Sequence, residues 1–311
     1  MKDLRDIDYE QYVSDEVPDY VEINDELLHI ETTLDLGENL IQQGPQGIGK
    51  TLSFEKVARE RGIPYIPFDC SKDTKRSHLV VQTTFGIDSD GNKKVEFIPA
   101  AIPKAMIAAN EYGEAMLVLE EMNALSPNMQ KMVNQISDYR EAIEISEAGG
   151  IIKVNEDSKL MVGATMNPSS VSSGIFDLNT DLRSRFNELN RQFPNNKKLQ
   201  DILRVNGVPS KIGSNYDGVR QQIATFIESI HSHAEQNKVS YEFSPRDAVR
   251  FGKMWNGYYE KMLDMNDQGM NEETESLRRC LETAVLGKFR EKGEREIIEE
   301  EIEDCFAVRT Y

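Results

Sequence analysis

The sequence predicts an α/β core with a mostly parallel sheet, followed by a small all-helical domain. From about residue 20 to residue 190, short apolar runs alternate with stretches of helical periodicity, which is the pattern of an α/β layer. After residue 193 the strand patterns almost disappear, and helical periodicity covers residues 199–205, 219–236, 245–264 and 273–305. We therefore expect a loosely docked N-terminal arm over residues 1–19, an α/β core over 20–193 and a helical domain over 194–311.

Each element of the core has its own signal in the sequence. The expected strands are apolar runs over residues 39–42, 64–69, 116–119 and 159–164, and the expected helices between or beside them cover 53–61, 104–109 and 127–138. Two further segments, 79–97 and 142–154, each turn at a cluster of glycine and polar residues and predict β-hairpins. A parallel sheet needs neither hairpin, so both are expected to be insertions that project from it.

Charge and composition limit the classes of function. The chain has 36 lysines and arginines against 54 aspartates and glutamates, a net charge of −18, so its average surface repels a phosphate backbone and only a local basic patch would bind nucleic acid. No apolar run approaches the roughly 20 residues of a membrane helix, and the first residues lack the apolar core of a signal peptide, so we expect a cytoplasmic protein. Cys70, Cys280 and Cys305 have neither the number nor the spacing of a disulfide framework or a zinc site.

Residues 44–51 contain the most specific motif of the chain. They read Gly-Pro-Gln-Gly-Ile-Gly-Lys-Thr and match the phosphate-loop pattern G-x-x-x-x-G-K-[ST] without departure. A strand is expected before this loop and a helix from Thr51, so the loop can turn its backbone amides toward a phosphate. Lys50 is expected to neutralise the β- and γ-phosphates of a nucleoside triphosphate, and Thr51 is expected to ligate magnesium. The predicted nucleotide-binding residues are Gly44, Pro45, Gln46, Gly47, Ile48, Gly49, Lys50, Thr51 and Leu52.

The apolar strand expected over residues 116–119 ends in two acids, Glu120 and Glu121. In phosphate-loop enzymes a neighbouring strand supplies one carboxylate to magnesium and a second that polarises the attacking water. Consecutive side chains of a strand diverge, so we assign Glu120 to magnesium and Glu121 to the water. The usual first residue is Asp, so Glu120 adds one methylene. That departure leaves open a nucleotide-dependent switch that barely hydrolyses.

Four further residues complete the predicted site. Asn167 follows the apolar run over 159–164 and would orient the attacking water, or else cap a turn. Arg183 and Arg185 would reach the nucleotide of a neighbouring subunit in a ring, or else form surface ion pairs. Arg246 follows a Ser-Pro pair that opens a helix, and it would reach the γ-phosphate or else be an ordinary surface residue.

In this order the motifs resemble those of the AAA+ superfamily, and the two hairpin insertions narrow the resemblance to the MoxR-like group with its CbbQ, NorQ and GvpN relatives. The resemblance covers about residues 20–255. Beyond the phosphate loop, or Walker A motif, it rests on residues 79–101 for the helix-2 insert, 119–127 for the acidic Walker B motif, 164–168 for sensor 1, 183–186 for the arginine finger and 244–246 for sensor 2. Arg185 aligns best with the finger, and Arg183 is the neighbouring candidate.

The resemblance implies an ATPase that uses ATP and Mg²⁺ in an oligomeric ring, usually a hexamer. In such rings hydrolysis moves the helical lid against the core, and the projecting hairpins transmit that movement to a protein client in a chaperone-like role. Relatives commonly act with a von Willebrand factor A domain protein. The alternatives are a nucleic-acid motor or loader of the same superfamily and the weakly hydrolysing switch. The hairpins offer Lys93, Lys94 and Lys153 among acidic residues, a balance that disfavours a grip on DNA.

Overall fold

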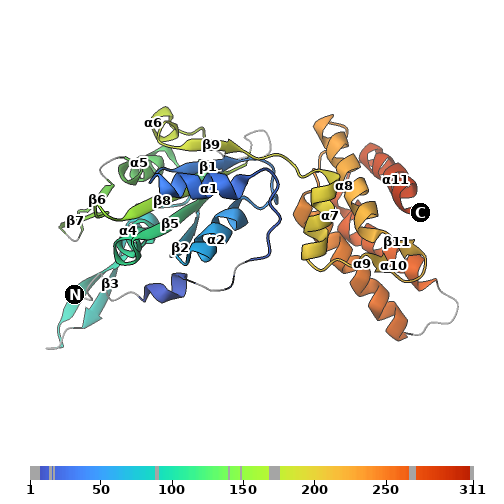
Figure 1. Ribbon diagram of the computed structural model, residues 1–311, viewed down its shortest axis with the longest axis horizontal. Helices are drawn as coiled ribbons and strands as arrows, with labels where there is room; N and C mark the ends of the chain where they lie inside the picture. Colours follow the sequence, from blue (N-terminus) through green and yellow to red (C-terminus); the bar gives the residue numbers. More distant parts are fainter. Residues whose placement is uncertain are drawn as a thin grey trace. The chain divides into compact units, whose positions relative to one another are not determined.

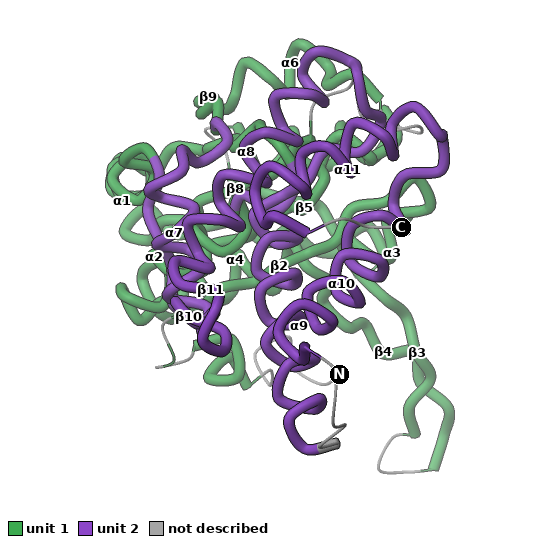
Figure 2. The backbone as a smooth tube through the Cα atoms, turned by 90° about the vertical axis from the view of Figure 1, so that its right-hand side faces the viewer, with its two compact units in different colours: residues 1–18, 24–45, 49–191 green, residues 19–23, 46–48, 192–311 purple. Residues whose placement is uncertain are grey.

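The structure is a computed structural model, and it describes residues 8–13, 16, 18–87, 91–138, 141–147, 149–167, 176–265 and 271–308. The chain divides into two compact units, drawn in green and purple in Figure 2. The core unit is formed mainly by residues 24–191, and the helical unit mainly by residues 192–311. Two short segments, 19–23 and 46–48, group with the helical unit.

The core unit is built on a five-stranded parallel sheet in the order β2-β5-β8-β1-β9. Its strands are β1 (Leu40–Gln43), β2 (Tyr65–Asp69), β5 (Glu114–Glu120), β8 (Lys159–Met166) and β9 (Asn187–Asn190). Every neighbouring pair is parallel, so the carboxyl ends of all the strands meet at one edge. The predicted α/β core is confirmed. The prediction omitted β9, an edge strand whose mostly exposed Asn-Glu-Leu-Asn sequence has no apolar run.

The central strands of this sheet are buried on both faces. In β5 the side chains from Ala115 to Leu119 are fully buried and enter two apolar clusters in alternation, as the period of a strand requires. Leu117 belongs to the cluster that packs on α4 and α5, whereas Met116 belongs to the cluster that packs on α1 and α2. These helices are α1 (Glu26–Asp35), α2 (Lys50–Arg61), α4 (Ala101–Tyr112) and α5 (Pro127–Ile136). With both faces covered, the polar side chains at the carboxyl ends are left at the sheet edge.

Both predicted insertions form antiparallel hairpins in two-stranded sheets of their own. They comprise β3 (Val81–Ile87) with β4 (Lys93–Pro99), and β6 (Ala142–Ile145) with β7 (Gly150–Lys153). The short helix α3 (Arg76–Leu79) leads into the first hairpin, which projects from the core unit in Figures 1 and 2. Within the predicted turns, residues 88–90 and 148 lie outside the described part of the chain.

The N-terminal arm is docked on the core unit over its described residues. Tyr9–Tyr12 form a short 3₁₀ helix, η1, and the Tyr9 side chain is 2% exposed inside an apolar cluster of that unit. Arg59 Nη1 donates a hydrogen bond to Tyr12 O at 2.8 Å. Over these residues the arm is packed on the core unit, since burying an aromatic ring stabilises such a contact by about 2 kcal/mol.

The helical unit consists of α7 (Asn196–Val205), α8 (Val219–Glu235), α9 (Pro245–Met265), α10 (Glu272–Ala284), α11 (Lys292–Phe306) and the small hairpin β10 (Lys211–Ile212)–β11 (Tyr216–Asp217). Its core is aromatic, with Phe226, Phe251, Trp255 and Phe306 all buried. The pattern predicted over 273–305 forms two helices instead of one, because a 3₁₀ turn, η3 (Leu286–Lys288), separates α10 from α11. In the described part of the chain, no helix combines the length and the apolarity that a bilayer span requires.

His231 makes the stability of the helical unit depend on pH. Its ring, on α8, stacks on Phe193 with centroids 4.1 Å apart, and its Nδ1 lies 3.0 Å from Glu242 Oε1. The contact with the Glu242 carboxylate raises the pKa of His231 above its ordinary 6.5, helped by the nearby Glu235 and Glu228 carboxylates and opposed by burial. The resulting stabilisation is fully present below the unfolded-state pKa and is lost as the pH rises through the folded-state pKa.

We therefore expect His231→Gln to lower the free energy of unfolding more at about pH 5.5 than at about pH 8.5, on either side of the ordinary histidine range. Urea unfolding followed by circular dichroism at both pH values measures this difference. Replacing Glu242 with Gln in the wild-type background removes the carboxylate and should shrink the pH dependence. A loss of stability that is the same at both pH values contradicts the assignment.

Candidate active site

The predicted phosphate loop connects β1 to α2 at the carboxyl edge of the sheet. Gly47 and Gly49 have φ angles of 73° and 85°, in the left-handed region that side chains disfavour, and Gly49 is the N-cap of α2. Gly44 is restricted by space instead, since a Cβ there would lie 2.5 Å from Arg191 O. The loop thus opens onto the N-terminus of a helix of 12 residues, whose free amides and positive dipole end attract a phosphate.

The ammonium group of Lys50 is held over this loop. Its Nζ donates hydrogen bonds to Gly44 O and Pro45 O, both at 2.7 Å, and to Asn167 Oδ1 at 3.0 Å. The residue is 8% exposed. An ammonium group has three donors and no acceptor, so phosphate oxygens are suitable replacements for these oxygen partners.

The two predicted magnesium ligands are in contact with each other. Thr51 Oγ1, in the first turn of α2, donates a hydrogen bond to Glu120 Oε2 at 2.9 Å. The extra methylene of Glu120 therefore does not prevent its carboxylate from reaching the loop. A hydroxyl and a carboxylate oxygen are the hard ligands that Mg²⁺ accepts beside phosphate oxygens and water, so this pair fits the ion.

Glu121 is placed by an unusual backbone conformation and by Asn167. Its φ of 53° lies in the left-handed region, which costs a side-chain-bearing residue roughly 1 kcal/mol or more and turns the chain sharply after β5. Glu121 N donates to Thr165 Oγ1 at 3.2 Å, and Asn167 Nδ2 donates to Glu121 Oε1 at 3.3 Å. Because Asn167 Oδ1 also accepts from Lys50, the Asn167 amide bridges the loop lysine and the Glu121 carboxylate.

Two residues that support this arrangement are absent from the predicted set. Thr165, in β8, accepts the backbone bond of Glu121, and the buried Asn123 donates its Nδ2 to Asn167 O at 3.2 Å. Asn123 lies inside the segment that resembles the acidic motif, but the sequence does not indicate which group its side chain bonds. A polar residue at a buried position was the available signal, since such groups need hydrogen bonds.

The two candidate finger arginines contact carboxylates of the same chain. Arg183 Nε and Nη2 donate to the Glu188 carboxylate at 2.5 and 2.8 Å. Arg185 Nη1 lies 3.3 Å from Asp138 Oδ1. The structure therefore joins Lys50 and the acidic strand end in one cluster, and it pairs these arginines with acids that the sequence did not assign to the site.

Arg246 lies in the first turn of α9, in the helical unit, where the helix start is tightly held. Ser244 Oγ donates to Asp247 Oδ2 at 2.7 Å, and Lys288 Nζ bonds the other oxygen of this buried carboxylate. Burial opposes ionisation of Asp247, but the hydrogen bonds from Lys288 and Ser244 prevail and lower its pKa. Residues 46–48 group with this unit, and a Cβ on Gly47 would lie 2.8 Å from Ser244 Cβ.

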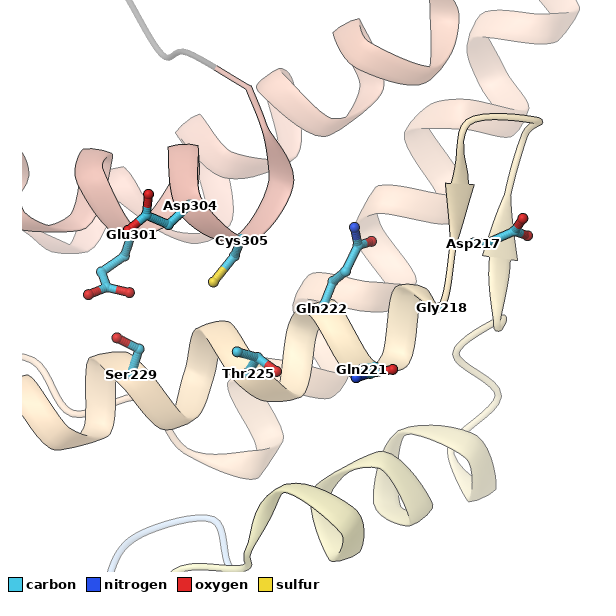
Figure 3. Close-up of a pocket in the computed structure, with 9 residues that line it drawn as sticks. All are labelled: Asp217, Gly218, Gln221, Gln222, Thr225, Ser229, Glu301, Asp304 and Cys305. Atoms are coloured by element: carbon cyan, nitrogen blue, oxygen red, sulfur yellow. The ribbon is translucent and has the colours of Figure 1, made fainter.

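A separate cavity of about 470 Å³ lies in the helical unit between α8, α11 and β11 (Figure 3). Its lining carries three carboxylates, two side-chain amides and no lysine or arginine. The lining residues are Asp217, Gly218, Gln221, Gln222, Thr225, Ser229, Glu301, Asp304 and Cys305. None of them belongs to the predicted nucleotide site.

Comparison with known proteins gives one family match and several distant relatives. Residues 39–186 match the family of the AAA domain, dynein-related subfamily. An uncharacterised protein of Staphylococcus haemolyticus is 22% identical over 268 residues, covering 86% of this chain and 90% of its own length. An uncharacterised protein of Staphylococcus aureus strain NCTC 8325 is 24% identical over 208 residues, covering 67% of this chain and 74% of its own.

Solved structures share the fold at low sequence identity. RuvB from Thermotoga maritima aligns with a TM-score of 0.53 at 16% identity, over 94% of this chain and 81% of that one. NtrX from Brucella abortus, solved in complex with ADP, aligns with a TM-score of 0.51 at 14% identity, over 89% and 60% of the two chains. Together with the parallel sheet, the loop and the helical unit, these likenesses show that the chain has the P-loop fold of AAA+ proteins, and the match over residues 39–186 supports its membership of the AAA+ family.

Proposed function

We propose that this protein is an ATPase that binds ATP with Mg²⁺ around Lys50 and hydrolyses it. The observation that carries the proposal is the continuous set of contacts from Lys50 through Asn167 to Glu121, beside the pair formed by Thr51 and Glu120. The match to the AAA domain supports nucleotide binding, and NtrX, a protein of the same fold, was solved with ADP.

In this proposal the loop segment 44–52 binds the phosphate chain. Its backbone amides, including those at the start of α2, donate hydrogen bonds to the β- and γ-phosphate oxygens, and Lys50 exchanges its present oxygen partners for them. Thr51 and Glu120 would hold Mg²⁺, which supplies charge neutralisation at the transferred phosphoryl group.

Glu121 acts as the general base for water. Its carboxylate takes a proton from a water molecule, the water oxygen forms a bond to the γ-phosphorus, and the bond from that phosphorus to the β–γ bridging oxygen breaks to release ADP and phosphate. Asn167 orients the Glu121 carboxylate with one side of its amide. Because the other side of the amide contacts Lys50, Asn167 fixes the position of the Glu121 carboxylate relative to the Lys50 ammonium group.

The arginines extend this proposal to a MoxR-like ring, most often a hexamer, that works in the cytoplasm. Arg185 is the better candidate to leave Asp138 and approach the ATP of a neighbouring subunit, with Arg183 next to it, and Arg246 responds to the γ-phosphate. Such a ring would remodel a protein client, for which a von Willebrand factor A domain protein is the candidate partner. The projecting hairpins would contact that client.

Two alternative functions have less support from the described residues. A nucleic-acid motor needs basic hairpins, yet Lys94 Nζ lies 3.2 Å from Glu96 Oε1 in the first hairpin. A weakly hydrolysing switch rests on the longer side chain of Glu120, which nevertheless reaches Thr51. ATP turnover measured with and without DNA, together with native mass measured with and without ATP, distinguishes the protein-remodelling ATPase from the nucleic-acid motor and the weakly hydrolysing switch.

The role of Arg185 in a ring gives a sharp test. Arg185→Ala should lower ATP turnover by roughly 10³-fold, as loss of an arginine finger does, and leave ATP affinity nearly unchanged. Mixing Arg185→Ala subunits with Glu121→Gln subunits should restore part of the activity, because some interfaces then combine an intact Glu121 with an intact Arg185. Arg183→Ala tests the neighbouring candidate, and Arg204→Ala, which breaks an exposed pair with Asp201, is the matched control for loss of an arginine. No recovery in the mixture, or a strict monomer with ATP, contradicts the ring.

A further inference from the structure

A fully buried polar network lies behind the phosphate loop, and no step of the proposed hydrolysis uses it. It joins Glu26 at the start of α1, Gln42 in β1, Ser53 in α2 and Arg191 just after β9. The side chains of Arg191 and Glu26 are 1% and 0% exposed, and Gln42 and Ser53 are fully buried. Burying an ion pair costs several kcal/mol of desolvation per charge, which apolar side chains of the same size would avoid. Stability alone is therefore a weak explanation for this network.

The contacts run in one direction, toward the backbone of Lys50. Arg191 Nη2 donates to Glu26 Oε1 at 2.7 Å, and Arg191 Nη1 donates to Gln42 Oε1 at 2.5 Å. Gln42 Nε2 then donates to Ser53 Oγ at 2.9 Å. Ser53 Oγ donates to Lys50 O at 2.8 Å, so the chain of bonds ends at the residue that carries the loop ammonium.

Arg191 determines which way the Gln42 amide points. A guanidinium group has only donors, so it attracts the amide oxygen of Gln42 and directs the amide nitrogen to the opposite side, toward Ser53. The backbone of Arg191 touches the loop as well. Arg191 N donates to Gln43 O at 2.7 Å, and Arg191 O occupies the place that a Cβ on Gly44 would need.

We infer that Arg191 is a positioning residue for the phosphate loop, acting through Gln42 and Ser53 on the backbone of Lys50. The inference rests on the proposed nucleotide site. Arg191 is also the last residue of the core unit, and the chain continues from Gln192 into the helical unit. The coupling is reciprocal: where the contacts of Arg191 favour the nucleotide-binding arrangement of the loop, bound nucleotide stabilises those contacts by the same free energy. We therefore expect nucleotide binding to order the segment that follows Arg191.

The affinity of the full-length protein for Mg²⁺-ADP, measured by isothermal titration calorimetry, tests this role. Arg191→Lys keeps a charge for Glu26 but lacks the fork that also reaches Gln42, and Gln42→Leu removes the amide at similar volume. Each substitution should weaken ADP binding by roughly tenfold, a typical coupling within a hydrogen-bonded network. Because both substitutions break the same network, the double variant should bind ADP as tightly as the single variant that has the lower affinity. Should Gln42→Leu fail to fold, Gln42→Glu serves the same purpose, because it accepts from Arg191 but cannot donate to Ser53.

The helical unit provides a matched control. Ser276 is fully buried and donates its Oγ to Glu273 O at 2.8 Å, the same bond that Ser53 makes to Lys50 O. Ser276→Ala should leave ADP affinity unchanged, whereas Ser53→Ala should weaken it. In wild type, Mg²⁺-ADP should also slow hydrogen exchange of the amides in 192–195, and Arg191→Lys should abolish that protection.

Each outcome has a distinct meaning. Absence of ADP binding by the wild-type protein refutes the proposed function itself. If the wild type binds ADP and the folded Arg191 and Gln42 variants bind it equally well while melting at lower temperature, Arg191 has only a structural role and the inference is wrong. Effects of the two substitutions that simply add would overturn it too.

Discussion

Replacing Lys50 with alanine should abolish measurable ATP turnover and weaken ADP and ATP binding by roughly 100-fold or more. Phosphate oxygens would lose a charged donor that is buried, pre-positioned and bonded to Gly44 O, Pro45 O and Asn167. One or two charge-assisted hydrogen bonds are worth about 3 kcal/mol together, which corresponds to that loss of affinity. Isothermal titration calorimetry with ADP and a coupled phosphate-release assay measure the two effects.

Lys56→Ala is the matched control for this change. Lys56 lies on the same helix, and its Nζ pairs with Glu60 at 2.8 Å, four residues along. Such a surface pair contributes little, so turnover should stay within about twofold of wild type. Nucleotide affinity that survives Lys50→Ala intact would mean that the nucleotide binds elsewhere on the chain.

Glu121→Gln should separate binding from chemistry. The amide keeps the shape of the side chain and an oxygen for Asn167 Nδ2, so the affinity for ATP should be retained. It cannot accept a proton from water, and loss of a general base lowers the rate by roughly 10²–10⁴-fold. Single-turnover hydrolysis, with ATP binding measured on the same sample, tests both statements.

Glu114 provides the control at the opposite end of β5. Its carboxylate lies 3.2 Å from Arg61 Nη2 and has no proposed role in hydrolysis. Glu114→Gln should leave turnover unchanged, whereas a Glu121→Gln protein that hydrolyses ATP at the wild-type rate would exclude Glu121 as the base. The Glu121→Gln protein with bound ATP is also the best variant for a pull-down of the client, because a protein that cannot hydrolyse ATP should retain the client that hydrolysis normally releases.

The sheet was predictable wherever its strands are buried on both faces. An apolar run such as Met116 to Leu119 is typical of a central parallel strand that is covered by helices on both faces, so β5 was predictable from the sequence. β9 was not evident, because an edge strand with exposed Asn187 and Glu188 has no apolar period to detect. The break between α10 and α11 escaped for a different reason, since buried Phe289 continues the apolar pattern across a turn.

The local motifs of the site were predictable, and its long-range partners were not. The spacing of residues 44–51 and the two acids after an apolar strand indicate a nucleotide site from sequence alone, and the individual roles stay predictions. The partners of Arg191 and Glu121, by contrast, lie 149 and 44 residues away in Gln42 and Thr165. One local signal was available, because Gln42 is a polar residue inside a buried strand and must find a partner.

A crystal structure of the wild-type chain grown with Mg²⁺ and a non-hydrolysable ATP analogue tests the proposed site most directly. We predict phosphate oxygens within hydrogen-bonding distance of Lys50 Nζ and of the amides of 47–51, with the metal on Thr51 and Glu120. The Glu121 carboxylate should face the terminal phosphorus across one water molecule. A nucleotide bound away from Lys50, or carboxylates of Glu120 and Glu121 that point away from its phosphates, would contradict the proposed ATPase.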